Sequence, residues 1–242
     1  MKRSRAHAAV LLAALAALAA VACGGGAPPE EKPPGDLVFA SQEAVLEQRA
    51  EKDAVLKTDA DSPIPEEMRA SFTALEYYPY DPALRFTAKL RRYPDPPPIK
   101  IITTMGKERP AVKAGYLEFA REGKRHRLQV YSLRDKDIPP EEWGNLFLPF
   151  LDATSGQETY GAGRYLDLDA RPDDWYVIDF NLAYHPLCAY GRTIYRCPRT
   201  PEENRLPFPV RAGEKGWVDH GSDAAALAAT AGAPPETDKK GH

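Results

Sequence analysis

The sequence predicts a mainly β fold: a single antiparallel domain, barrel- or sandwich-like, with one or two helices at its N-terminal end. Prolines make up 24 of the 242 residues, about twice the usual share, and each removes a backbone donor that a helix would use. Residues 84–92 alternate between apolar and polar side chains, which is the period of a half-buried strand. Further short apolar runs follow, separated by turn residues, as in antiparallel sheets.

Helix signals are confined to the beginning of this domain. Ser41 has the side chain of a helix N-cap, and Glu43 follows in the first turn, where the helix dipole favours an anion. We predict a helix from there to about Thr58 and, because its apolar residues are weakly periodic, interpret it as docked on the surface. A second, short helix is predicted to begin within S-P-I-P-E-E at 62–67, with proline in its first turn.

The strands are predicted in the remainder of the domain. The letters R-E-G-K around Gly123 indicate a tight hairpin between two of them. The predicted strands are 84–92, 100–104, 112–119, 127–133, 146–150, 164–168, 175–180 and 207–211.

The first 22 residues are typical of an export signal. A basic start precedes an uncharged run of 15 residues at 8–22, about 22 Å as a helix and too short for a hydrocarbon core of about 30 Å. The run ends in small residues followed by Cys23, which resembles a bacterial lipoprotein signal. The resemblance implies cleavage before Cys23 and acylation of its thiol, with palmitate among the acyl chains. A plain secretory signal cut nearby is the alternative.

Four segments follow from these patterns: a signal peptide at 1–22, a flexible tether at 23–36, the β-rich domain at 37–216 and a disordered tail at 217–242. Gly24, not aspartate, follows the cysteine, so we expect a lipid-anchored protein of the outer membrane that faces the periplasm. The formal net charge of −3 gives no reason to bind nucleic acid. The expected partners are therefore the membrane, through the lipid, and a small-molecule ligand.

Polar and aromatic side chains are concentrated in two stretches of the predicted domain, 151–165 and 179–198. A few hydroxyls, carboxylates and aromatic rings are what orient a ligand in an otherwise apolar pocket. We therefore predict ligand binding at a rim formed by 152–165 and 179–190. The predicted binding residues are Asp152, Thr154, Ser155, Glu158, Tyr160, Arg164, Asp179, Asn181, Tyr184 and Tyr190.

A hydrolytic or metal-dependent enzyme is the alternative function. Its candidate catalytic residues are Glu158, Asp179 and His185, which can act as general acid or base with or without a metal. The same carboxylates can instead bind backbone amides in the glycine-rich turns and pair with Arg164. The protein would then be neither a ligand-binding protein nor an enzyme but a structural lipoprotein of the envelope, in which these motifs only stabilise the fold. The sequence identifies no cofactor.

Cys188 and Cys197 allow three interpretations. Once Cys23 carries lipid, an even pair of cysteines in an exported protein usually forms a disulfide, which would add about 2–3 kcal/mol of stability. Alternatively, His185, Cys188 and Cys197 bind a metal with a fourth ligand from elsewhere, such as Asp179. In the third interpretation Cys188 is a thiol nucleophile and His185 its base.

Three long motifs resemble a known bacterial family. They are F-x-D-x-T-S-G-x-E-T-Y-x-x-G-R-Y-L at 150–166, D-F-N-x-A-Y-x-P-x-C-A-Y at 179–190, and C-P…E-N-R-L-P followed by A-G-E-K at 197–215. Residues 62–82 fit the N-terminal pattern of the same family, known as domain of unknown function 1684. The resemblance covers about residues 40–216 and implies no activity. The family usually has asparagine where this chain has His185, which weakens the case for a catalytic His185.

Overall fold

The computed structural model describes residues 31–134, 145–192 and 194–216. Within these residues two α-helices, α1 (Gln42–Thr58) and α2 (Glu66–Arg69), precede the strands. None of the described helices has the length and apolar character needed to cross a bilayer. The predicted signal peptide, Cys23 and the predicted tail lie outside the described residues, as does most of the predicted tether.

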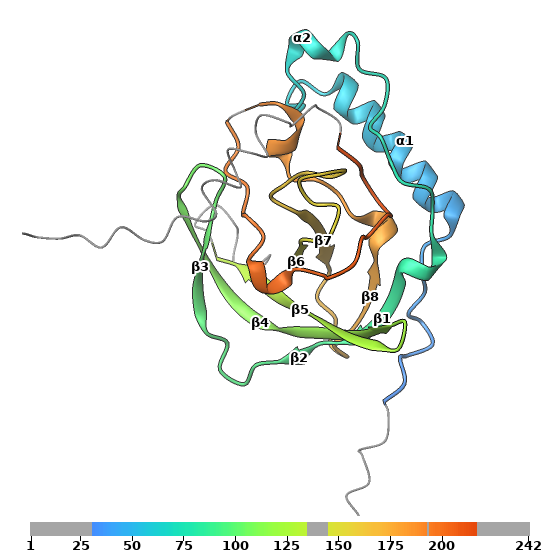
Figure 1. Cartoon of the computed structure of the whole chain (residues 1–242), viewed down its shortest axis with the longest axis vertical. Helices are drawn as coiled ribbons and strands as arrows, with labels where there is room; N and C mark the ends of the chain where they lie inside the picture. Colours follow the sequence, from blue (N-terminus) through green and yellow to red (C-terminus); the bar gives the residue numbers. More distant parts are fainter. Residues whose placement is uncertain (1–30, 135–144, 193, 217–242) are drawn as a thin grey trace, which may run out of the picture. The chain divides into compact units, whose positions relative to one another are not determined.

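The strands form two antiparallel sheets (Figure 1). The smaller sheet pairs β1 (Arg85–Lys89) with β8 (Trp175–Asp179). In the larger sheet the order is β2-β4-β5-β6-β7, and β3 also pairs with β4. The sheets are not closed into a barrel, and the prediction of a mainly β, sandwich-like domain is confirmed. The strands of the larger sheet are β2 (Arg91–Arg92), β3 (Pro98–Ile102), β4 (Glu108–Arg121), β5 (Lys124–Leu133), β6 (Leu146–Phe150) and β7 (Arg164–Leu168).

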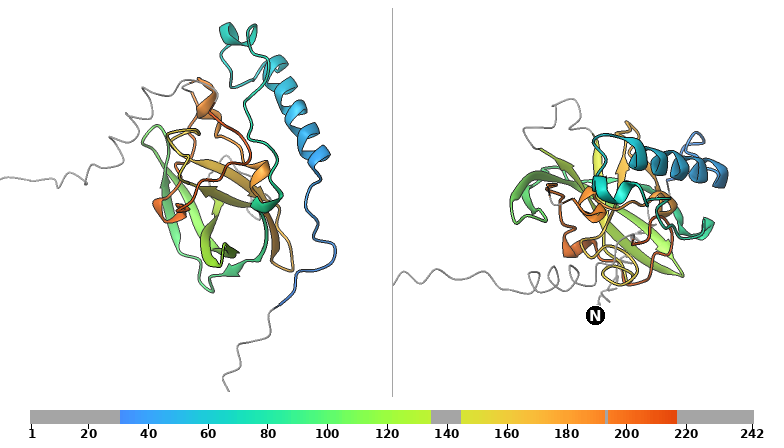
Figure 2. Two further views of the ribbon diagram at one scale, coloured as in Figure 1. Left: turned by 45° about the vertical axis from the view of Figure 1, so that its right-hand side comes forward. Right: turned by 90° about the horizontal axis from the view of Figure 1, so that it is seen from above.

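The main hydrophobic core receives side chains from both sheets, whose ribbons Figure 2 shows in two further views. Alternate residues of β1 and of β4 to β8 face it, which is the reason for the period of two in the sequence. Phe150 and Phe180 are fully buried at its centre, with ring centroids 4.9 Å apart. Other members include Leu84, Ala88, Leu117, Phe119, Leu128, Val130, Leu148, Leu166, Tyr176 and Ile178.

The turn between β4 and β5 is the hairpin that the sequence predicts. Arg121 pairs with Lys124, and the two residues between them, Glu122 and Gly123, have φ angles of 52° and 74°. Positive φ at both loop positions matches the right-handed twist of the flanking strands. Glycine adopts this conformation without a steric cost, so the position of Gly123 is explained.

Two predicted strands differ from the observed ones. Residues 84–92 form β1 and β2 instead of one strand, because the N–H of Leu90 donates to the carbonyl of Asp174 and the chain there changes sheets. Residues 207–211 form no strand. Prolines at 207 and 209 offer no N–H, and the N–H of Val210 donates to the carboxylate of Asp152, 2.6 Å away.

Helix α1 begins where the sequence predicts and lies on the surface. The hydroxyl of Ser41 accepts a hydrogen bond from the N–H of Ala44, as an N-cap does. Of its 17 residues only Val45 and Leu56 are buried. The helix is also held by Arg49, whose guanidinium donates to the carbonyls of Tyr78 and Asn181 at 3.0 and 3.1 Å. These contacts bring α1 against the segment that follows β8.

Short 3-10 helices connect the remaining elements. The last of them, η5 (Glu202–Asn204), places the amide of Asn204 between β5 and β6. Asn204 Nδ2 donates to the carbonyls of Gln129 and Pro149, and its Oδ1 accepts from the N–H of Gln129. The side chain replaces strand-to-strand hydrogen bonds where β5 and β6 pair only at Tyr131 and Phe147. The others in the described part of the chain are η1 (Pro82–Leu84), η3 (Phe180–Leu182) and η4 (Leu187–Tyr190).

Candidate functional site

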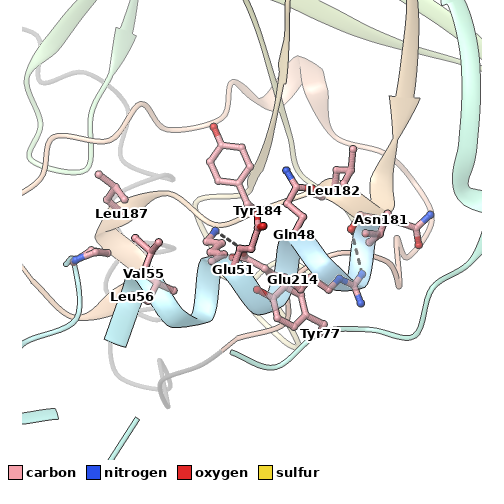
Figure 3. A pocket seen from close by; sticks show the side chains of 15 residues that line it. Gln48, Glu51, Val55, Leu56, Tyr77, Asn181, Leu182, Tyr184, Leu187 and Glu214 are labelled. Atoms are coloured by element: carbon pink, nitrogen blue, oxygen red, sulfur yellow. Dashed lines mark hydrogen bonds and ion pairs between the residues drawn. The ribbon is translucent and has the colours of Figure 1, made fainter. Parts of the chain in front are cut away.

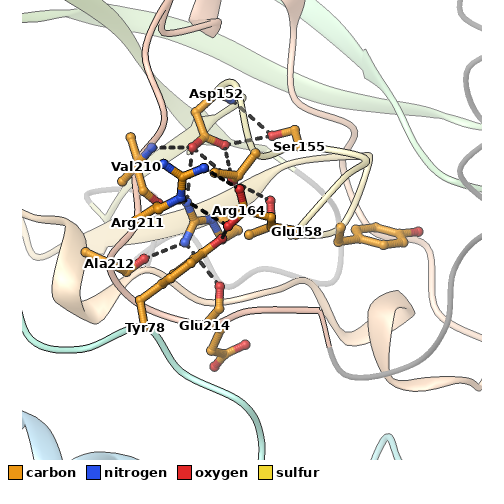
Figure 4. A network of polar contacts seen from close by, with 12 residues as sticks. Tyr78, Asp152, Ser155, Glu158, Arg164, Val210, Arg211, Ala212 and Glu214 are labelled. Carbon is orange, nitrogen blue, oxygen red and sulfur yellow. Dashed lines mark hydrogen bonds and ion pairs between the residues drawn. The ribbon is translucent and has the colours of Figure 1, made fainter.

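The first predicted loop surrounds a buried arginine. Arg164, the first residue of β7, has no exposed surface on its side chain and donates to three backbone carbonyls, those of Val210, Ala212 and Glu214 (Figure 4). Its guanidinium also lies 3.4 Å from the carboxylate of Asp152. Arg164 therefore fixes the segment 210–214 against the start of β7.

Asp152 is the buried acceptor at the centre of the same network. It accepts from the hydroxyls of Thr154 and Ser155 and from the N–H of Val210, in addition to the contact with Arg164. A buried carboxylate is stable only when such donors surround it. Asp152, Thr154, Ser155 and Arg164 thus bind the backbone and one another, which is the structural interpretation of this motif.

Glu158 lies at the outer edge of this network. Its carboxylate accepts from the hydroxyl of Tyr78 at 3.0 Å and from two nitrogens of Arg211 at 2.7 and 3.1 Å. The hydrogen bond from Arg211 is the main reason that the pKa of Glu158 lies below its usual value. A carboxylate that loses protons more readily is a poorer general acid or base near neutral pH.

Asp179 and Asn181 connect the end of β8 to the chain before β1. Oδ1 of Asp179 accepts from the N–H and Nδ2 of Asn181. The amide of Asn181 exchanges two further hydrogen bonds with the backbone of Asp81. Within the described part of the chain, Oδ2 of Asp179 is buried without a hydrogen-bond partner. Both side chains hold the segment after β8 in place.

His185 is buried beneath the first loop. Its Nε2 accepts from the backbone N–H of Tyr160 at 3.4 Å, the backbone N–H of His185 donates to the carboxylate of Glu214 at 2.8 Å, and Nδ1 of the ring lies 3.8 Å from the same carboxylate. The imidazole therefore packs between Tyr160, also buried, and Glu214. Among the described residues, no group of three or more histidine, cysteine or acidic side chains could hold a metal ion. His185, Cys188 and Cys197 therefore do not form the metal site that was the alternative interpretation.

The two cysteines of the domain are adjacent. The sulfur atoms of Cys188 and Cys197, both free thiols in the structure, lie 2.6 Å apart, and the N–H of Cys188 donates to the sulfur of Cys197. The contact between the sulfurs lowers the pKa of Cys188 to about 6 and raises that of Cys197. Thr104 also contacts the sulfur of Cys188, at 3.1 Å.

A groove of about 580 Å³ lies between α1 and the segment that follows β8 (Figure 3). One wall is the face of α1 that carries Val45, Lys52 and Val55. The opposite wall runs from Asn181 to Leu187. Tyr77 and Glu214 complete the lining, together with Gln48, Arg49, Glu51, Leu56 and Pro63. Such a volume is within the usual range of small-molecule sites.

Glu214 forms the polar floor of the groove. Its side chain is 2 % exposed and accepts from the ammonium of Lys52, from the hydroxyl of Tyr190 at 2.6 Å and from the N–H of His185. Lys52 also donates to the hydroxyl of Tyr190 at 3.1 Å. Burial and the adjacent carboxylate raise the pKa of Tyr190 well above its usual value, so its hydroxyl keeps its proton.

Tyr184 provides an aromatic surface beside this floor. The ammonium of Lys52 lies 5.2 Å from the centre of the Tyr184 ring, within the range of a cation–π contact. The hydroxyl of Tyr184 donates to the carboxylate of Asp167. The Tyr184 backbone pairs with that of Tyr165 in β7, so the sheet positions this wall of the groove.

The chain is similar to known proteins both in sequence and in structure. The model of the family described as "Protein of unknown function (DUF1684)" matches residues 70–215, more than half of the chain. The chain belongs to this family. An uncharacterized protein of Haloarcula marismortui, solved in solution by NMR, is 34 % identical, with a TM-score of 0.54 over 73 % of this chain and 94 % of that one. The comparison with curated proteins gave no match.

In this DUF1684 protein, the structure divides the predicted binding residues between two places. Asn181 and Tyr184 line the groove, and Tyr190 contacts its floor through Glu214. The predicted residues of the first loop, from Asp152 to Arg164, belong to the network around Arg164 or pack near His185. Glu158, Asp179, His185 and Cys188 are not among the described residues that line the groove.

Sequence reasoning did not identify the other groove residues. Glu214 lies in the A-G-E-K motif of the DUF1684 resemblance, but its role depends on Lys52, 162 positions earlier in the chain. One signal for Arg49 and Lys52 is present in the sequence: the two cations are about one turn apart on a helix whose apolar residues are weakly periodic. Nothing in the sequence indicates that this face meets residues 181–187.

Proposed function

We propose that the protein is a lipid-anchored protein of the cell envelope that binds a small ligand in the groove between α1 and residues 181–187. This proposal keeps the predicted function and places the ligand in the groove instead of at the loop 152–165. In that loop the polar side chains already bind one another and the backbone. The groove is the observation that carries the proposal.

The composition of the groove supports a ligand with a substantial apolar part. Val55 and Leu187 line it and are 55 % and 47 % exposed, respectively. Removing such side chains from water stabilises a complex by about 25 cal/mol per Å² of apolar surface. The polar groups are concentrated at the floor, around Glu214. Apolar walls with a few convergent polar groups are the usual composition of a ligand site.

A charge placed on the groove wall should weaken ligand binding there. We expect the neutral fluorescent probe N-phenyl-1-naphthylamine to bind the purified protein, and Val55→Arg to reduce its affinity about tenfold, because the probe would be buried against a charge. Fluorescence titration measures both affinities. Val38→Arg is the control, since Val38 is also exposed and does not line the groove. Equal affinities for the two variants would reject the groove as the site.

The lipid anchor is part of the proposal and rests on the sequence around Cys23. We expect Cys23→Ser to move the protein from the membrane fraction to the soluble fraction and to abolish incorporation of labelled palmitate, because the acylated thiol is lost. The chain with Cys23 should fractionate with the outer membrane. Labelling of the Cys23→Ser variant, or an unchanged distribution between fractions, would contradict the anchor.

We further propose that Cys188 and Cys197 form a disulfide in the oxidising envelope. Their 2.6 Å separation supports it, because oxidation then needs little movement of the backbone. Iodoacetamide should label neither residue before reduction. After reduction, labelling of Cys188 should reach half its maximal rate near pH 6, since its pKa is lowered to about 6 and the thiolate is the reactive form. Labelling without reduction would contradict the disulfide, and a midpoint above pH 8 would contradict the lowered pKa.

A further inference from the structure

We infer that the ligand of the groove is an uncharged amphiphile: an aliphatic chain that ends in a single hydrogen-bond-accepting carbonyl, as in an amide or ester. This inference rests on the proposed function and specifies the chemistry of its ligand. Most charged and polar groups of the groove already pair with other groups of the protein, and this limits the head groups that the groove can bind. The apolar walls accept the chain, and the floor decides the head group.

The two opposite charges at the floor neutralise each other. Lys52 forms an ion pair with Glu214, and Tyr190 and the N–H of His185 complete the hydrogen bonds of that carboxylate. Because Glu214 is almost completely buried, its negative charge depends on these partners. The charges of Lys52 and Glu214 therefore compensate each other, and a ligand in the groove meets no net charge at the floor.

Most of the other buried polar atoms of the groove residues have partners within the protein. The terminal nitrogens of Arg49 donate to the carbonyls of Tyr78 and Asn181, whereas its Nε, among the described residues, is buried without a hydrogen-bond partner and so is closed to a ligand. The amide of Asn181 binds Asp81 and Asp179. The hydroxyl of Tyr184 donates to Asp167. Gln48 and Glu51 are exposed at the rim, where water competes for their hydrogen bonds.

One donor at the floor stays available for a ligand. The ammonium of a lysine has three N–H groups, and among the described residues that of Lys52 donates to two acceptors, Glu214 and Tyr190. The side chain of Lys52 is 31 % exposed and lines the groove. Its third N–H can therefore donate to a ligand atom, and a carbonyl oxygen is an acceptor that needs no partner in return.

A charged head group fits this floor less well than a neutral one. A carboxylate at the third N–H of Lys52 would approach Glu214, which already shares the same cation. An alkylammonium would approach Lys52 and Arg49, which occupy the surfaces of Tyr184 and Tyr77. Either ion would also lose hydration without gaining an uncompensated opposite charge. A neutral carbonyl accepts the hydrogen bond and adds no net charge.

Three probes with the same chain length test the head group. N,N-dimethyldodecanamide, dodecanoate and dodecylammonium are titrated against the protein loaded with N-phenyl-1-naphthylamine, and displacement is followed by fluorescence. We expect the amide to displace the reporter at a concentration about tenfold lower than either ion. A lower half-displacement concentration for dodecanoate or dodecylammonium would overturn the neutral head group and leave the proposed function intact. Reporter binding that Val55→Arg does not weaken would reject the proposed function itself.

Substitution of Lys52 tests the donor directly. In the wild-type protein the amide should displace the reporter at a lower concentration than dodecane, which has no head group. In Lys52→Met this advantage should disappear, because the long apolar side chain is kept and the N–H is lost. Lys57→Met is the matched control, since Lys57 is on the same helix and does not line the groove. If Lys52→Met is unstable because Glu214 loses its cation, Lys52→Met combined with Glu214→Gln restores a neutral floor. An amide advantage that persists in these variants would overturn the role of Lys52.

Discussion

Replacing Arg164 by methionine should destabilise the domain by about 3–5 kcal/mol, the range for breaking a buried ion pair by removing one partner. The substitution keeps the bulk of the side chain but leaves Asp152 buried without its cation. It also removes the donor to the carbonyls of Val210, Ala212 and Glu214. Because natural domains have a net stability of about 5–15 kcal/mol, this is a large fraction of the total. Urea unfolding followed by circular dichroism measures the change.

Arg211→Met is the matched control for this experiment. Arg211 is exposed and its ion pair is with Glu158, at the outer edge of the same network. Exposed pairs contribute little because water screens them, so this variant should unfold close to the wild-type midpoint. Similar losses for the two variants would mean that Arg164 does not hold segment 210–214 as the hydrogen bonds indicate.

Replacing Gly213 by alanine should destabilise the domain by about 2–5 kcal/mol and also impair the groove. Its φ of +75° is unfavourable for alanine, and an added Cβ would lie 2.5 Å from the carbonyl oxygen of Ala183 and 2.8 Å from that of Phe180. Conformational strain contributes about 1–2 kcal/mol, and overpacking against a fixed backbone contributes a further 1–3 kcal/mol. Thermal and urea unfolding measure the stability, and titration with N-phenyl-1-naphthylamine measures the groove.

The variant Gly123→Ala separates conformational strain from overpacking as causes of the loss. Gly123 has nearly the same φ, +74°, but an added Cβ would meet nothing within 4 Å. This variant should lose only about 1 kcal/mol, from strain alone, and bind the reporter normally. If Gly213→Ala were no more destabilising than Gly123→Ala, the close packing of Gly213 against the segment 180–183 would be refuted.

Both substitutions concern the position of Glu214. Arg164 binds the backbone carbonyl of Glu214 (Figure 4). The side chain of Glu214 lines the groove (Figure 3) and binds Lys52. Gly213 itself packs closely against the backbone of Phe180 and Ala183, and the N–H of Glu214 donates to the carbonyl of Ala183 at 2.9 Å. Arg164 and Gly213 thus support the groove from behind, whereas other residues of the family motifs line it, among them Asn181, Tyr184 and Glu214.

The elements with strong local signals were predictable. The alternation within the predicted strand 84–92, the turn at Gly123 and the cap at Ser41 depend on neighbouring residues only. The turn and the cap are found where the pattern places them, and β1 (Arg85–Lys89) forms within the predicted strand. The prediction of a strand at 207–211 was wrong. The backbone N–H of Val210 donates to the carboxylate of Asp152, 58 positions away in the sequence, instead of to a neighbouring strand. Local periodicity contains no information about that partner.

The roles of the polar motif residues could not be predicted in the same way. In the sequence, Asp152, Glu158 and Arg164 have the composition of either a ligand site or a structural network. The choice depends on which donors surround each carboxylate after folding. For Asp152 these donors include Val210, and for Glu158 they are Tyr78 and Arg211, all distant in the sequence.

By itself, the sequence determined that the protein is a mainly β member of its family with a helix at the start of the domain, because local pattern and long motifs decide both. Only the tertiary structure decided where a ligand site can form. The groove needs Lys52 from α1 and Glu214 from the end of the domain to meet beside Tyr184. Such a meeting is set by the packing of α1 against the segment after β8, and packing between distant segments leaves no periodic signal in either of them.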